Sequence, residues 1–99
     1  MPATVVRYRT KPDRADENQA LIEAVFADLE RRGTKGFSYQ AFRLADGVSF
    51  VHVVVEDEGV AEPDSLQDVP AFQAFVAGIA DRCDVQPEPS GATVAGSWR

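Results

Sequence analysis

The Asp46-Gly47 pair, near the middle of the chain, restricts the fold more than any other feature. Segments rich in β-branched and aromatic residues flank it, GFSYQAFRL at 36–44 and VSFVHVVV at 48–55. An Asp-Gly pair suits a type I′ turn, whose two central residues both take positive φ. The pattern therefore predicts an antiparallel hairpin in which Ala45 pairs with Val48.

This register determines which side chains share a face, because successive residues of a strand point to opposite sides. One face, called the mixed face below, carries Phe37, Tyr39, Ala41, Arg43, Phe50, His52 and Val54. The other, the valine face, carries Ser38, Gln40, Phe42, Leu44, Val51, Val53 and Val55.

The segment before the hairpin predicts a strand and then a helix. Residues 4–9 (TVVRYR) are typical of a strand, and Pro12 interrupts it. Asp13 is a candidate N-cap for a helix of about 18 residues that ends at Gly33. One apolar stripe runs along this helix: Leu21, Ile22, Val25, Phe26 and Leu29.

The segment after the hairpin predicts an acidic loop at 56–64, a second helix at 70–83 and a closing strand at 92–99. The second helix begins at Pro70, and its expected buried face comprises Phe72, Phe75, Val76, Ile79, Ala80 and Cys83. Pro87 and Pro89 are expected to end regular structure before a turn at Ser90-Gly91. Trp98 is expected to pack on the helices of its own chain or on a partner subunit.

The resulting order, β-α-β-β-α-β, predicts an α+β ferredoxin-like domain spanning residues 1–99. With right-handed crossovers, two helices cover one face of a four-stranded antiparallel sheet. The other face would be bare, and a chain of 99 residues cannot easily leave a large apolar face in water. We therefore expect a homodimer in which a second copy covers it.

Composition argues against several classes of function. A formal charge of −6 without a cluster of Lys and Arg disfavours nucleic acid and anionic membranes as partners. Cys83 is the one cysteine and His52 the one histidine, so an intrachain disulfide and zinc sites rich in Cys or His are excluded. We expect no metal and no cofactor, the acidic loop being a solvated charge run. The opening residues do not resemble a signal peptide, and a cytoplasmic location is expected.

The mixed face provides the candidate site. His52 lies diagonal to Tyr39 and Arg43 in the predicted register, and Phe50 is its neighbour on the same face. A histidine, a phenol and a fixed cation could bind an anionic or phenolic ligand, with His52 as the candidate catalytic residue. The alternative is structural: His52 would be a hydrogen-bonded core or interface residue, and Tyr39 and Arg43 would bond to a partner subunit.

Three segments carry a resemblance to a known family: Val5-Val6-Arg7-Tyr8, the hairpin around Asp46-Gly47, and residues 70–75 (PAFQAF). With the element order, they resemble the dimeric α/β-barrel superfamily, in particular the small antibiotic-biosynthesis-monooxygenase-like proteins. The resemblance implies a barrel formed by two sheets across a two-fold axis, with ligands between a sheet and its helices.

The activities that this resemblance implies include cofactor-independent oxygenation of phenolic polycyclic substrates. The haem-degrading branch is a poorer match, because it uses a histidine from the second helical region, where this chain has none. Two functions follow as hypotheses. One is a small-molecule enzyme, either a cofactor-free monooxygenase on a phenolic or aromatic substrate or an isomerase. The other is a non-catalytic dimeric module that binds a small ligand or a protein.

Overall fold

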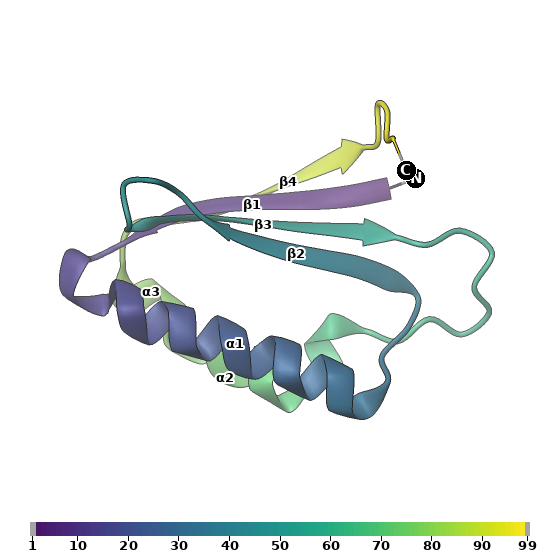
Figure 1. The fold of residues 1–99 in the computed structure, drawn as a ribbon, viewed down its shortest axis with the longest axis horizontal. Coiled ribbons are helices and arrows are strands. Elements are labelled where there is room, and N and C mark those ends of the chain that lie inside the picture. The colour runs from purple at the N-terminus through teal and green to yellow at the C-terminus, as the bar shows by residue number, and fades with distance from the viewer. Residues whose placement is uncertain (1, 99) are drawn as a thin grey trace.

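The computed structural model describes residues 2–98, and in it the helices cover one face of a four-stranded antiparallel sheet (Figure 1). The strands lie in the order β2-β3-β1-β4. Their bounds are β1 Pro2–Thr10, β2 Phe37–Arg43, β3 Ser49–Glu56 and β4 Cys83–Thr93. The helices are α1 Ala15–Arg32, α2 Pro70–Ala77 and α3 Ile79–Arg82, with short 3-10 turns η1 Pro12–Arg14 and η2 Leu66–Asp68. The predicted ferredoxin-like α+β fold is confirmed.

The hairpin between β2 and β3 has the predicted register. Ala41 pairs with His52, and Arg43 pairs with Phe50. The predicted turn type is wrong, because among the described non-glycine residues only Glu62 has positive φ, so Asp46 does not. Gly47 alone is left-handed, and its N–H bonds to the Leu44 carbonyl at 2.9 Å. The Asp46 carboxylate instead accepts bonds from the backbone N–H groups of Val48 and Ser49, which stabilises a longer loop.

The first helix follows the prediction at its end and departs from it at its start. Gly33 ends α1 in the left-handed conformation, with its N–H on the Glu30 carbonyl. Asp13 is not the N-cap, because it lies within η1, and α1 begins at Ala15 without a side-chain cap. The stripe that α1 buries comprises Ala15, Asn18, Ile22, Val25 and Asp28, so two polar residues lie on it.

The second helix is shorter than predicted. It breaks at Gly78, and Cys83 is the first residue of β4 rather than the last of the helix. Phe75 is buried, whereas Val76 is 46% exposed. Glycine favours such a break, and the space where a side chain at 78 would begin lies 3.1 Å from Nη1 of Arg82.

The closing strand begins earlier than predicted and contains both Pro87 and Pro89. Within the described residues, β4 is an edge strand that pairs only with β1. An edge strand tolerates proline because one side of it needs no donors. Trp98 lies beyond β4 and is 91% exposed, so it does not pack on the helices of its own chain.

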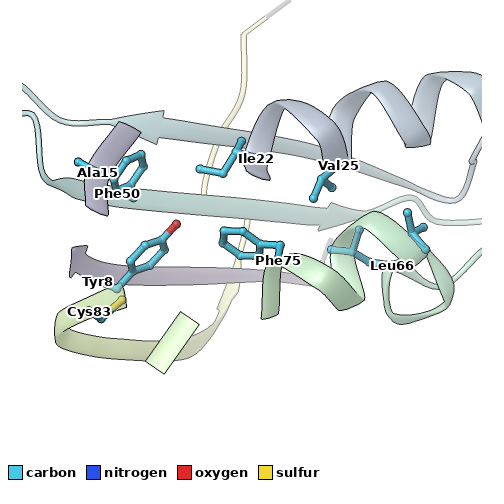
Figure 2. Packing of buried hydrophobic residues seen from close by; sticks show 9 residues of the cluster. Tyr8, Ala15, Ile22, Val25, Phe50, Leu66, Phe75 and Cys83 are labelled. Carbon is cyan, nitrogen blue, oxygen red and sulfur yellow. The ribbon is translucent and has the colours of Figure 1, made fainter. Parts of the chain in front are cut away.

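The core lies between the sheet and the helices, and the mixed face is the face that it covers. Figure 2 shows Tyr8 and Phe50 from the sheet packed with Phe75 of α2. The rings of Tyr8 and Phe50 stack at a centroid distance of 5.5 Å. Cys83 is a free, buried cysteine beside Tyr8, as its predicted core role requires. No helix within residues 2–98 is long and apolar enough to cross a bilayer.

Candidate functional site: a buried chain of hydrogen bonds

His52 lies at the centre of the mixed face with a tyrosine hydroxyl on each ring nitrogen. Its Nε2 lies 2.7 Å from Oη of Tyr8, and its Nδ1 lies 2.6 Å from Oη of Tyr39. The three side chains come from three adjacent strands, β1, β3 and β2. The sheet places them together because His52 pairs with Val6, two residues before Tyr8, on one side. On its other side His52 pairs with Ala41, two residues after Tyr39.

Asn18 and Arg82 extend this chain of hydrogen bonds on the helical side. Asn18 Nδ2 donates to Oη of Tyr8 at 2.9 Å, and Arg82 Nε donates to Oδ1 of Asn18 at 3.1 Å. Arg82 also donates to the Phe75 carbonyl at 2.7 Å, and its guanidinium lies over the Phe75 ring. The order of groups is therefore Arg82, Asn18, Tyr8, His52 and Tyr39, called the relay below.

Burial determines the protonation states in the relay. Desolvation lowers the pKa of His52 to about 4, because the imidazolium would lose its water in this pocket. Desolvation also raises the pKa of both Tyr8 and Tyr39 well above the ordinary phenol value. At neutral pH the relay therefore contains a neutral imidazole between two neutral phenols.

The relay reaches the surface at Tyr39, which is half-buried. Its ring lies 4.9 Å from the ring of Phe26, centroid to centroid. Together these rings border a groove of about 180 Å³ between α1 and β2, lined by Phe26, Leu29, Glu30, Thr34, Phe37 and Tyr39. An apolar cavity of about 150 Å³ is known to hold benzene, so this groove accommodates one aromatic ring, and its open side leaves room for more.

A larger hollow of about 410 Å³ adjoins this groove at Thr34. Its lining lacks every relay residue and comprises Arg32, Thr34, Pro63, Asp64, Ser65, Asp68 and Val69. We therefore place the candidate site at the smaller groove, where the relay ends.

The structure brings together two of the four residues singled out from the sequence. Tyr39 and His52 are in direct contact, and Phe50 is buried in the core, where its ring stacks on that of Tyr8. Arg43 does not join them, because its guanidinium bonds to Asp16 at 3.0 Å and lies over the Phe50 ring. Within residues 2–98, no three His, Cys, Asp or Glu side chains form a metal-binding group.

Sequence reasoning missed Tyr8, Asn18 and Arg82. One signal could have identified Asn18, because it falls at helical spacing on the same stripe as Ala15, Ile22 and Val25. A polar residue on a buried stripe requires a hydrogen-bond partner. Tyr8 and Arg82 had no such signal, because their contacts join residues 44 and 64 positions apart in the chain.

Comparison with known proteins identifies the fold. No known family model matches the chain, and no curated protein matches it in sequence. Among solved structures, Rv0793 from Mycobacterium tuberculosis is similar with a TM-score of 0.73 at 20% identity, over 97% of this chain and 96% of that one. A structure described as an antibiotic biosynthesis monooxygenase gives 0.72 at 16% identity, over 97% of this chain and 100% of that one.

A third structure is a variant of SnoaB from Streptomyces nogalater, described as a cofactor-independent oxygenase. It gives a TM-score of 0.65 at 16% identity, over 97% of this chain and 94% of that one. These likenesses cover nearly the whole chain at low identity, so they concern the fold. The chain has the ferredoxin-like α+β fold of the antibiotic-biosynthesis-monooxygenase-like proteins.

Proposed function

We propose that this protein binds a small phenolic or aromatic molecule in the groove between α1 and β2 and oxygenates it without a cofactor. One observation carries the proposal: Tyr39 belongs both to the relay and to the wall of an aromatic groove. Ligand sites are concave and orient their ligands with a few convergent polar groups. This open groove offers the aromatic rings of Phe26 and Tyr39 together with the Tyr39 hydroxyl. The similarity to a cofactor-independent oxygenase supports the same class of chemistry by analogy of fold.

The relay is suited to stabilising negative charge on a substrate oxygen. With a pKa of about 4, His52 is a weak base at neutral pH, so its role is that of a neutral hydrogen-bonding group. A fixed donor facing a developing anion lowers the energy of that anion. In the proposed reaction, an activated methylene of the substrate loses two hydrogens and gains one oxygen atom from O₂. The other oxygen atom leaves as water, and the substrate supplies all the electrons.

Binding is tested with 1-naphthol and naphthalene, which differ only in the hydroxyl group. We expect wild-type protein to bind 1-naphthol about fivefold to tenfold more tightly, as one hydrogen bond would give. Tyr39→Phe should remove this preference while naphthalene binding stays unchanged, as measured by calorimetry. Equal affinity of wild-type protein for both ligands would contradict the proposed site.

Turnover is tested separately, because the alternative is a non-catalytic binding module. His52 favours that alternative in one respect, since tyrosine hydroxyls occupy both its ring nitrogens. The assay follows oxygen uptake by metal-free protein with 1,8-dihydroxyanthrone, against the uncatalysed rate and against Tyr39→Phe. Formation of the anthraquinone faster than in the absence of protein supports an enzyme. Binding without acceleration would favour the module.

We also propose that a second copy covers the valine face. This face is open in the structure, and several of its apolar residues are substantially exposed, including Phe42 at 46% and Leu44 at 37%. Val85 of β4, which pairs with Arg9, adds a third at 45%. Exposed apolar patches of this kind mark association surfaces. The cytoplasmic location stays a prediction from the sequence.

A further inference from the structure

The direction of every hydrogen bond in the relay follows from Arg82. A guanidinium has donors only, and Arg82 donates through Nε to Asn18. The oxygen of the Asn18 amide must therefore face Arg82, which turns its nitrogen toward Tyr8. A buried arginine thus fixes an amide orientation that geometry alone would leave open.

The hydrogen bonds of the Tyr8 hydroxyl determine which ring nitrogen of His52 carries the hydrogen. The Tyr8 oxygen accepts from Asn18, and Nε2 of His52 is the other group in contact with it. If Nε2 carried the hydrogen, the Tyr8 hydroxyl hydrogen would have no acceptor within residues 2–98, although Tyr8 is only 4% exposed. A buried donor without a partner is strongly disfavoured. Tyr8 therefore donates to Nε2, and the imidazole hydrogen is on Nδ1.

We propose that Asn18 and Arg82 are positioning residues that hold His52 in the Nδ1–H tautomer, so that Tyr39 offers its hydroxyl hydrogen to an acceptor oxygen of the ligand. The Nδ1–H group donates to the Tyr39 oxygen, and no other acceptor in the described chain takes the Tyr39 hydrogen. The matching ligand atom is a carbonyl or phenolate oxygen. This choice of ligand atom rests on the proposed function of the groove, whereas the tautomer does not.

The substitution Asn18→Asp should reverse the direction of the hydrogen bonds from Tyr8 to Tyr39. A carboxylate still accepts from Arg82, but it can only accept from Tyr8 as well. The Tyr8 hydroxyl would then donate to residue 18, its oxygen would accept from Nε2–H, and Nδ1 would become an acceptor. Tyr39 would donate inward to Nδ1 and present lone pairs to the groove. Gln19→Glu is the matched control, because it adds the same charge to α1 outside the relay.

The tautomer is measured by ¹⁵N NMR of histidine-labelled protein at pH 8. His52 is the only histidine, so the spectrum contains a single imidazole. We expect a protonated Nδ1 in wild type and in Gln19→Glu, and a protonated Nε2 in Asn18→Asp. A protonated Nε2 in wild type would overturn the proposal without any variant. An unchanged tautomer in a folded Asn18→Asp protein would overturn it too.

The ligand atom is tested with three bicyclic probes of similar size: 1-indanone, which only accepts, indole, which only donates, and indene, which does neither. We expect wild-type protein to bind 1-indanone about fivefold more tightly than indene and indole no more tightly than indene. Asn18→Asp should exchange the two preferences. Preference for indole in wild type would contradict the proposed polarity.

The two readouts separate this inference from the proposed function. If the tautomers are as expected but none of the probes binds, the assigned ligand atom and the groove as a binding site are wrong, while the positioning role of Asn18 and Arg82 stands. If the probes bind and wild-type His52 carries its hydrogen on Nε2, the positioning role is wrong and the groove stands.

Discussion

His52 is a histidine that the fold keeps neutral. Its ordinary pKa of 6.5 falls to about 4 in the folded protein because burial removes the water that would stabilise the charged ring. The unfolded chain therefore binds a proton at a higher pH than the folded chain does. The contribution of neutral His52 to the free energy of unfolding is therefore complete above pH 6.5 and is lost as the pH falls toward 4.

This linkage predicts a specific pH dependence. The free energy of unfolding should fall between pH 7 and pH 4, with His52 accounting for a loss on the order of 3 kcal/mol. Urea unfolding at several pH values measures it, with His52→Gln as the control for the carboxylates. The variant should show a shallower slope between pH 6.5 and 4.5. Equal slopes in the two proteins would contradict the neutral buried histidine.

Tyr8 and Tyr39 bond to the same imidazole but differ in burial, so removing each hydroxyl should have a different cost. Tyr8→Phe leaves Asn18 Nδ2 and Nε2 of His52 without a shared partner in the core, and should cost about 1–3 kcal/mol. Tyr39→Phe leaves one group, the Nδ1–H of His52, without its acceptor, and because Tyr39 is only half-buried this variant should cost less than Tyr8→Phe, about 1 kcal/mol. Thermal or urea unfolding of both variants measures the difference. A larger loss for Tyr39→Phe would contradict the assigned burial of the relay.

At the scale of elements, the α1–β2 connection is constrained by the loop at 57–65. Gly36 is buried with φ of +104°, and an added Cβ would lie 2.5 Å from Cβ of Pro63. The Asp57 N–H bonds to the Gly36 carbonyl, which joins the start of β2 to the end of β3. This contact holds one end of the groove in place, since Phe37 follows directly.

Two glycine substitutions test this constraint. Gly36→Ala should be the more destabilising, because it adds a steric clash to the cost of a left-handed backbone, which is about 1–3 kcal/mol. Gly47→Ala, with φ of +78° and open space around it, should show the backbone cost alone. Denaturant unfolding of the two variants gives the comparison. Equal losses would mean that the loop moves away from position 36 easily.

At the scale of the whole molecule, the open valine face leaves apolar side chains exposed to water. In the part of the chain that the structure describes, the helices cover only the other side of the sheet (Figure 1). Burial of apolar surface contributes about 25 cal/mol per Å², so covering exposed side chains such as Phe42 with a second copy is favourable. Two sheets facing each other would leave both grooves accessible, since each lies on the helical side.

The assembly is tested by native mass spectrometry of wild type, Phe42→Lys and Val76→Lys. Phe42 and Val76 are each 46% exposed, but Val76 lies on α2, away from the valine face. We expect a dimer for wild type and Val76→Lys, and a monomer for Phe42→Lys, because a buried charge without a partner destabilises the interface. A monomeric wild-type protein would contradict the proposed dimer.

The sequence alone determined the features that local rules govern. Helical spacing and Gly33 set the end of α1, and the Asp46-Gly47 hairpin placed Tyr39 and His52 on one face with the observed register. The tertiary structure decided which face the helices cover, because apolar burial has no direction and both faces carry apolar residues. It also brought Tyr8, Asn18 and Arg82 to His52 and directed Arg43 to Asp16 instead. Those contacts join distant parts of the chain, and they form only when the whole sheet and its helices have packed.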